Sequence, residues 1–406
     1  MTQVATANPK LKVAPLDPTV RALGVVSLLN DFSSEVAVRT LPLFLANVLG
    51  VRTTIVGLIE GVAESTATLL KLVSGHISDR IGKKKALTFW GYSLSNLTKP
   101  LLYFATSWTL ILLVRFLDRV GKGVRSAPRD ALIAEVTRPE DRGRAFGFNK
   151  AMDKAGGVIG VLLAAGVLYL TERNAVALTW QSYQWLVLLA VLPGLAAMAI
   201  LAKWVEERPA PPVKVPDRFL WSEMGGRFWA FIAILTLFTL GNSSDAFLML
   251  RAQTLGLSLV EIFLLIALFN LVISATSTKG GAISDTFGRR GLIVIGWLIY
   301  AAVYFGLAYA SSEWHMWVLY PAYGLYYGAF QGASSALIAD LVPQHLRGTG
   351  YGIFTAALGV AAFPASLIAG ILWDWYGPSA PFLFGGVLSL VSVLGLLMLP
   401  AMPSKN

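Results

Sequence analysis

The chain contains the stretch Ala131-Leu132-Ile133-Ala134-Glu135, followed by Arg142-Gly143 and Gly147. A second copy lies about 205 residues further on: Ala336-Leu337-Ile338-Ala339-Asp340, followed by Arg347-Gly348 and Gly352 at the same spacing. Two other pairs of segments agree with this shift to within a few residues. Gly75–Lys84 resembles Gly281–Arg290, and Ser33-Ser34-Glu35 resembles Ser243-Ser244-Asp245. The sequence is therefore predicted to consist of two related halves.

The composition predicts an integral membrane protein. Hydrophobic residues make up 55% of the 406 residues, charged residues only 14%, and the mean hydropathy is +0.64. Such a chain is too apolar for a soluble domain of this length. The net charge of +10 is attributed to the excess of Lys and Arg in loops on the cytoplasmic side, because the basic residues lie at the ends of the apolar stretches and within them. Binding to nucleic acid is not expected.

Twelve apolar stretches are long enough to cross a bilayer as helices. Their approximate limits are 20–49, 53–79, 85–106, 108–134, 144–170, 180–204, 227–252, 257–284, 290–310, 313–340, 347–374 and 379–400. The expected fold is all-α, with twelve transmembrane helices in two pseudo-symmetric six-helix halves. The halves are expected at 19–204 and 227–402, with a tail at 1–18 and a linker at 205–226 that contains four prolines.

The loops predict the orientation. Basic residues gather in the loops on one side, whereas Arg52 and Arg173 are the main ones on the other. This asymmetry places both termini in the cytoplasm of a multi-pass inner-membrane protein. The first eighteen residues show no cleavable signal pattern, so the first span is expected to direct its own insertion.

The twelve spans, the central loop and one further motif together resemble the major facilitator superfamily. The motif is Gly75-x-x-x-Asp79-Arg80-x-Gly82-Lys83-Lys84-Lys85, with a weaker copy at Asp285, Gly288 and Arg289. The resemblance covers nearly the whole chain and implies a secondary transporter that works by alternating access. It also implies a gating role for this loop, in which Asp79 caps and pairs with neighbouring helix ends. The expected gating residues are Gly75, Asp79, Arg80, Gly82, Lys83, Asp285, Gly288 and Arg289.

The fourth span carries a stripe of charge. Its members recur every three or four residues and so share one face of a helix: Arg115, Asp118, Arg119, Lys122, Arg125 and Arg129. Charge at membrane depth is costly, so the stripe is expected to face inward. Arg115 resembles an arginine that the family's proton-coupled members use in proton transfer. For Arg125, Arg129 and Asp130 a structural salt-bridge cluster is favoured.

The first span supplies carboxylates. Asp31, Glu35 and Arg39 follow at i, i+4 and i+8, which places them on one helix face within the bilayer. Buried carboxylates can exchange protons near neutral pH. Asp31 and Glu35, with Arg115, are therefore the expected proton-coupling residues. The alternative for each charged pair is a static bridge that locks two helices together, and for Glu60, Lys71 and Lys99 this alternative is at least equally favoured.

Substrate contacts are expected from both halves. The second half is poorer in charge and richer in aromatic side chains, which suits an amphipathic organic molecule. The candidates are Arg39, Asp118, Arg119, Lys150, Asp153, Lys154, Asp245, Tyr323, Tyr327 and Gln331. The glycines at 156, 157 and 160 allow helices to pack closely and to slide.

Other classes of protein are less consistent with the sequence. There is no Gly-x-x-x-x-Gly-Lys-Ser/Thr loop for ATP, and the three histidines are far apart and lack the spacing of a metal site. No enzyme activity, catalytic residue, metal or other cofactor is expected. The favoured function is proton-coupled efflux of an amphipathic compound by a monomeric antiporter, with small-molecule substrate, protons and membrane lipid as partners. The alternative is a transporter of an organic, phosphorylated or lipid-like anion bound by the basic stripe.

Overall fold

The computed structural model describes residues 15–81, 83–207 and 223–399, except for the side chains of residues 75–81, 277–287 and 331. In this part of the chain the helices form twelve spans, as predicted. The first half holds α1 (Pro18–Asn47), α2 (Thr53–Ile81), α3 (Lys84–Thr98) with η1 (Lys99–Phe104), α4 (Trp108–Val136), η2 (Pro139–Asp141), α5 (Arg142–Thr171) and α6 (Trp180–Trp204). The second half holds α7 (Gly226–Gly241) with α8 (Ala246–Thr254), α9 (Leu259–Phe287), α10 (Arg289–Tyr309), α11 (Glu313–Leu341), η4 (Gln344–Leu346), α12 (Arg347–Tyr376) and α13 (Ala380–Met398).

The duplication seen in the sequence is confirmed by the helix bounds. The series α4, η2 and α5 recurs as α11, η4 and α12 with every bound shifted by 205 residues, from Trp108 to Glu313 at its start. Each copy also has an ion pair at its end, formed by Lys84 with Glu135 and by Arg289 with Asp340. The acidic residue that closes each repeated stretch therefore ties the end of one helix to the start of another.

Two spans are less regular than the sequence suggests. The third ends as the 3-10 turn η1, where Pro100 near its start has no N–H to donate. The seventh is interrupted between α7 and α8, at Asn242, Ser243, Ser244 and Asp245. These residues are polar, and their side chains compete with the backbone for hydrogen bonds. The interruption exposes backbone groups inside the bundle and brings Asp245 close to the first half.

Seven spans in the described part are long and apolar enough to cross a membrane by composition alone: α5, α6, α7 with α8, α9, α10, α12 and α13. Helices α1, α2 and α4 are not among these seven, and they carry ionisable residues within their length, such as Glu35, Glu60 and Arg115. Polar groups must be satisfied inside the bundle when lipid surrounds it. The more polar spans are therefore expected to direct these groups toward each other.

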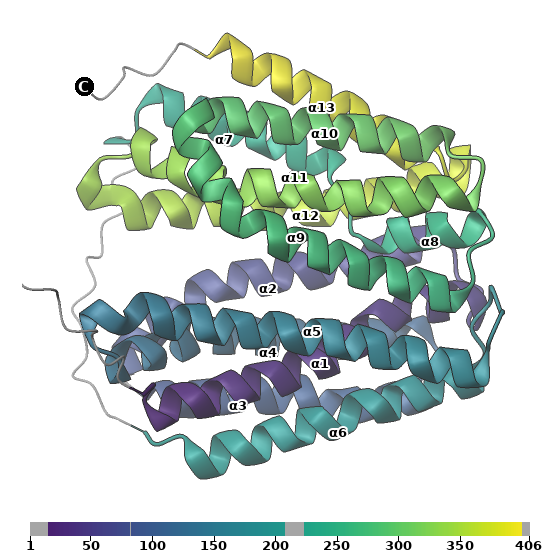
Figure 1. Ribbon diagram of the computed structural model, residues 1–406, viewed down its shortest axis with the longest axis horizontal. Coiled ribbons are helices and arrows are strands. Elements are labelled where there is room, and N and C mark those ends of the chain that lie inside the picture. The colour runs from purple at the N-terminus through teal and green to yellow at the C-terminus, as the bar shows by residue number, and fades with distance from the viewer. Residues whose placement is uncertain (1–14, 82, 208–222, 400–406) are drawn as a thin grey trace, which may run out of the picture.

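The two six-helix halves lie side by side, with the first half below the second in Figure 1. We name the two ends of the bundle by their loops. The linker end holds the start of α1, the end of α6 and the start of α7; the opposite end holds the α1–α2 and α5–α6 connections. Helix α2 packs along α12, and α5 along α9. All hydrogen bonds between the halves among the described side chains lie from the middle of the bundle to the opposite end.

The contact between α2 and α12 is close because glycines form it. A Cβ atom placed on Gly57 would lie 2.2 Å from the carbonyl oxygen of Ser366, and one on Gly61 would lie 2.8 Å from that of Phe363. On the other helix, a Cβ on Gly370 would lie 2.6 Å from the carbonyl oxygen of Thr53. No side chain fits at these points unless the backbones separate.

An aspartate from the second half caps a helix of the first. Asp374, near the end of α12, accepts hydrogen bonds from the backbone N–H groups of Thr53 and Thr54 at 3.0 and 2.9 Å. It also accepts from both threonine hydroxyls, each at 2.5 Å. The first N–H groups of a helix have no partner within that helix, and a carboxylate is stabilised there by the helix dipole. Asp374 therefore fastens the opposite end of the bundle across the two halves.

We predict that Asp374→Ala opens this end. Loss of a charged cap costs about 1–2 kcal/mol. The fraction of molecules in which the two halves are separated at the opposite end should therefore rise by roughly tenfold. The chain has no cysteine, so nitroxide labels can be placed at Thr106→Cys and Ser311→Cys, one on each half at the opposite end. Pulsed electron paramagnetic resonance should show a larger long-distance component in the variant. Glu172→Ala is the control, because Glu172 accepts from Ser182 within one half. Identical distance distributions in native protein and Asp374→Ala would refute this role.

Candidate functional site

A cavity of about 360 Å³ lies between α1 and α4 of the first half. It is lined by Asp31, Ser34, Glu35 and Val38 from α1 and by Asp118, Arg119, Lys122 and Arg125 from α4. Three carboxylates and three cations thus face one space. Two faces that were predicted separately, the carboxylate face of the first span and the basic stripe of the fourth, come together here.

Close packing of α1 on α5 fixes the carboxylate face. A Cβ on Gly156 would lie 2.0 Å from the carbonyl oxygen of Leu28, and one on Gly160 would lie 2.7 Å from that of Phe32. Between these two contacts, a Cβ on Gly157 would meet the Glu35 side chain at 3.3 Å. The three glycines therefore let α5 approach the part of α1 that carries Asp31 and Glu35.

Arg39 joins the two halves at the middle of the bundle. Its Nε donates to Glu35 Oε2 at 3.0 Å, and its Nη1 donates to Asp245 Oδ2 at 3.3 Å. Glu35 is one turn earlier on the same helix, whereas Asp245 lies at the interruption between α7 and α8. Among the described residues this is the ion pair that crosses between the halves. It links a cavity carboxylate directly to the position of the other half.

Arg115 and Arg119, the two arginines of the α4 stripe that lie farthest from the linker end, are paired with carboxylates. Arg115 Nη2 donates to both oxygens of Glu60 on α2, at 2.7 and 2.9 Å, and both residues are almost fully buried. Arg119 lies 3.3 Å from Glu64 and 3.5 Å from Asp118. The structure thus places Arg115 in a contact between α2 and α4 and gives it no bond to Asp31 or Glu35 in the described part. Arg119 and Asp118 do reach the cavity.

Lys99 is a buried cation with no carboxylate in bonding contact among the described residues. Its ammonium donates to Ser33 Oγ at 2.7 Å, to Ser34 Oγ at 3.1 Å and to Asn96 Oδ1 at 2.9 Å, and the residue is 3% exposed. From the sequence, a static salt bridge was at least as favoured for Lys99 as a functional role. The sequence does contain one signal for this environment, which is the pair Ser33 and Ser34 next to Glu35. A lysine ammonium has three N–H donors and needs several acceptors at membrane depth, and two serine hydroxyls can supply them.

Asp31 differs from the other carboxylates of this region. It lines the cavity and has no hydrogen bond or ion pair with any other described residue. Glu35, Glu60, Glu64, Asp118, Asp153 and Asp245 each lie within 4 Å of an arginine. The side-chain ammonium of Lys122, which also lines the cavity, likewise has no hydrogen bond or ion pair in the described part.

The linker end of the stripe is a cluster of polar contacts. Arg129 pairs with Asp130 at 3.2 Å and with Asp153 of α5 at 3.4 Å. Arg125 donates to Ser95 at 3.0 Å and lies over the Tyr92 ring at 4.4 Å. Lys150 and Lys154 on α5 are exposed. The structure therefore ties Asp153 to α4, and among the described residues neither lysine forms an ion pair.

The second half contributes an aromatic wall. Tyr323 donates to Asn242 at 3.2 Å, and Asn242 donates to Tyr326 at 3.3 Å, so the residues at the interruption between α7 and α8 contact α11. The Tyr323 ring is stacked on Phe269 and edge-on to Tyr327. Tyr327 is partly buried, whereas Tyr323 is fully buried. The side chain of Gln331 lies outside the described residues.

Most side chains of the expected gating motif lie outside the described residues. These are the side chains of Asp79, Arg80 and Asp285, and Gly82 also lies outside, whereas the backbone of Gly75 belongs to α2. Lys83 is exposed just before α3, and Gly288 joins α9 to α10 with φ of +73°, a conformation that favours glycine. Arg289 pairs with Asp340 and also donates to the Ala336 carbonyl at 2.8 Å. Its described contacts therefore lie within the second half.

The arrangement can exchange protons and hold charged groups. No group of three or more His, Cys, Asp or Glu side chains suited to a metal occurs among the described residues. Among the described residues, the cavity offers a carboxylate and an ammonium without ion pairs, Asp31 and Lys122, together with Arg119, which is paired with Glu64 and Asp118. Bonded networks of this kind in a bundle core mark pathways for ions or substrates.

Comparison with known proteins identifies the family. A family model of the Major Facilitator Superfamily matches residues 23–363 and 251–406. An uncharacterised MFS-type transporter of Methanocaldococcus jannaschii is 34% identical over 392 residues, which is 95% of each chain. A multidrug resistance protein, MdtH of Photorhabdus laumondii, is 32% identical over 120 residues, about 30% of each chain.

The solved structures agree on the fold. A bacterial homologue of the human lysosomal transporter Spinster, in its inward-facing and occupied conformation, superposes with a TM-score of 0.73 at 15% identity. The superposition covers 94% of this chain and 95% of that one. The duplicated helices, the charged cavity in the first half and these matches lead to one conclusion: the chain belongs to the major facilitator superfamily of membrane transporters.

Proposed function

We propose that this transporter couples proton movement to the export of an amphipathic organic compound across the inner membrane. The observation that carries the proposal is Asp31, a cavity-lining carboxylate without a bonded partner in the described region. A carboxylate held by an arginine gains little by taking up a proton, because the charged form is already stabilised. Asp31 lacks such a partner and is thus the group best suited to bind and release a proton during transport.

The contacts of Arg39 suggest how proton binding reaches the gate. Arg39 is shared by Glu35, beside Asp31 on the cavity wall, and Asp245 of the other half. Protonation removes the negative charge of Asp31 near Glu35. This changes how strongly Arg39 is attracted to Glu35 relative to Asp245. Release of Asp245 would free the second half to move. In this proposal Asp31 and Glu35 are the coupling residues, and Arg39 and Asp245 convert charge into motion.

The conformation corresponds to one side of an alternating-access cycle. The described contacts between the halves are concentrated away from the linker end. In this proposal the basic loops put the linker end on the cytoplasmic side, and this arrangement is then the one closed toward the outside. The limited similarity to a multidrug resistance protein supports efflux. In the described part of the second half, the aromatic wall of Tyr323 and Tyr327 suits an apolar portion of the substrate.

A second candidate is a transporter for an organic or phosphorylated anion. The cavity contains Lys122, whose side-chain ammonium has no hydrogen bond or ion pair among the described residues. Arg125 on the same wall contacts Ser95 and Tyr92 and no described carboxylate. These two cations are better placed than Arg115 to hold an anionic group, because the charge of Arg115 is matched by Glu60. In this version Lys150 and Lys154 would attract the anion toward the cavity.

Asp31→Asn is expected to uncouple transport. In proteoliposomes with a pH gradient, accumulation of substrate against its own gradient should be lost, while exchange of substrate at equal concentrations continues. The amide keeps the shape of the carboxylate but cannot carry the proton. Asp130→Asn is the control, since Asp130 lies on α4 outside the cavity beside Arg129. Gradient-driven accumulation that persists in Asp31→Asn would remove Asp31 from the mechanism.

Glu60→Gln should mainly destabilise the protein, because it leaves the Arg115 guanidinium buried without its counter-charge. Breaking a buried pair costs about 3–5 kcal/mol, whereas replacing both partners by apolar residues costs much less. In detergent, the midpoint temperature of thermal unfolding should therefore fall strongly in Glu60→Gln and less in the double variant Glu60→Met/Arg115→Met. A stable single variant with altered pH dependence of transport would instead assign this pair to coupling.

Lys122→Gln separates the two candidate functions. A direct bond from Lys122 to an anionic substrate predicts a loss of affinity of roughly tenfold or more at every pH, because a charge-assisted hydrogen bond is removed. A lysine that only tunes Asp31 predicts a shift of the transport profile along the pH axis with unchanged affinity at acidic pH. Lys71→Gln, on an exposed lysine of α2, controls for loss of charge. A pH-independent loss confined to Lys122→Gln would contradict the first proposal and support the anion transporter.

A further inference from the structure

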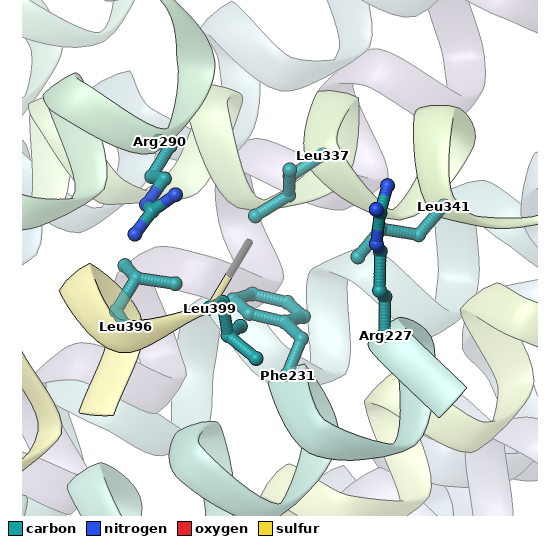
Figure 2. A pocket seen from close by; sticks show the side chains of 7 residues that line it. All are labelled: Arg227, Phe231, Arg290, Leu337, Leu341, Leu396 and Leu399. Carbon is teal, nitrogen blue, oxygen red and sulfur yellow. The ribbon is translucent and has the colours of Figure 1, made fainter. Parts of the chain in front are cut away.

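An apolar groove with two arginines lies at the linker end of the second half, far from the charged cavity of the first. Its volume is about 310 Å³. Figure 2 shows Arg290 and Arg227 on either side of a floor of leucine and phenylalanine side chains. The lining residues come from α7, α10, α11 and α13 and from the residue that follows α13: Arg227, Phe231, Arg290, Leu337, Leu341, Leu396 and Leu399. None of these lining residues is a carboxylate that could neutralise the two arginines.

Both arginines keep donors available. Arg290 Nη2 donates to the Leu397 carbonyl at 2.5 Å, which orients the guanidinium at the mouth of the groove. A guanidinium has five N–H donors, so the others remain free for a ligand. Arg227 is exposed and has no hydrogen bond or ion pair with any other described residue. Two cations above a buried apolar floor complement a molecule with an anionic head and a hydrocarbon tail.

In the first half, the place that corresponds to this groove lies between the start of α3 and the end of α6. Lys85 corresponds to Arg290 under the shift of 205 residues, and its ammonium donates to the Ala202 carbonyl near the end of α6 at 3.3 Å. At this place Glu207 accepts the backbone N–H groups of Lys85 and Ala86 at 2.9 and 2.8 Å. A carboxylate of the chain itself therefore fills the site in the first half.

The described part of the second half shows no such carboxylate at the start of α10. The first turn of α10 has no side-chain cap, and the sequence contains no Asp or Glu after Asp374. The groove thus combines the start of α10 with Arg227 and Arg290 at a place where the first half holds an anion. An anion from outside the chain could take the place in the second half that Glu207 takes in the first.

We propose that this groove binds an anionic phospholipid. The phosphate would lie between Arg227 and Arg290, with part of an acyl chain along Phe231, Leu396 and Leu399. The depth is suitable, because α7 and α10 begin here and α11 and α13 end here, which places the groove at the level of lipid head groups. Basic pockets between helices at this level are suited to anionic head groups. The site is independent of the transported substrate and of proton coupling.

Native mass spectrometry of the full-length protein in detergent tests the proposal. Dioleoyl phosphatidylglycerol should bind as one saturable adduct, with dioleoyl phosphatidylcholine, dihexanoyl phosphatidylglycerol and inorganic phosphate all binding more weakly. Arg227→Gln/Arg290→Gln should weaken the first adduct by roughly thirtyfold, because each arginine near the surface contributes about fivefold to binding. The control Arg142→Gln/Lys203→Gln removes two exposed cations from the same end of the first half and should leave the adduct unchanged.

Four results would overturn the proposal. Equal losses in both double variants would indicate non-specific attraction to net charge. Equal affinity for phosphatidylcholine would show that the groove recognises only hydrocarbon. Equal affinity for inorganic phosphate would make it a site for the free anion. Binding that appears only after residues 400–406 are deleted would assign the groove to the chain's own tail.

Discussion

The need to balance ionisable groups inside a lipid-surrounded bundle governs the first half of this transporter. Charge at membrane depth is tolerated when it is paired or faces a polar space. Arg115 with Glu60, Arg119 with Glu64 and Asp118, and Arg129 with Asp153 meet that requirement within the first half. Arg39 meets it only by reaching Asp245 in the second half as well as Glu35. The charge balance of the cavity therefore depends on how the two halves are placed.

Close backbone contact is the second constraint, and it acts at the opposite end. Gly57 and Gly61 on α2 allow α12 to approach so closely that a side chain at either point would meet its backbone. Asp374 adds a helix cap across the same contact. Where the glycines lie, backbone meets backbone, so there is little side-chain interdigitation to undo when the halves separate. This suits an interface that must form and break in every cycle of alternating access.

The sequence predicted the architecture well because duplication and apolar length are properties of the chain itself. The shift between Ala131–Glu135 and Ala336–Asp340 recurs in the helix bounds, and the i, i+4 spacing of Asp31 and Glu35 placed both on the cavity wall. Which helix faces which could not be derived in this way. The partner of Arg115 depends on the rotation of α2 against α4, and the role of Asp374 depends on a residue some 320 positions away in α2.

Local polarity was also an incomplete guide. The sequence predicts one continuous span through residues 242–245. In the structure these residues interrupt the helix and bring Asp245 to Arg39. For Lys99 the sequence favours a static salt bridge at least as much as a functional role, yet its described bonds go to two serines and an asparagine. In both cases the surroundings are set by contacts between segments far apart in sequence, which spacing along one helix cannot reveal.

The central claim is that protonation of Asp31 controls whether the halves stay joined through Arg39. It is tested most directly by the distance between labels at Thr106→Cys and Ser311→Cys, measured in liposomes over a range of pH. The account predicts that the distribution changes with pH in the otherwise native protein and becomes independent of pH when Asp31→Asn is added. An unchanged pH response in the Asp31→Asn protein, with the same midpoint, would contradict it.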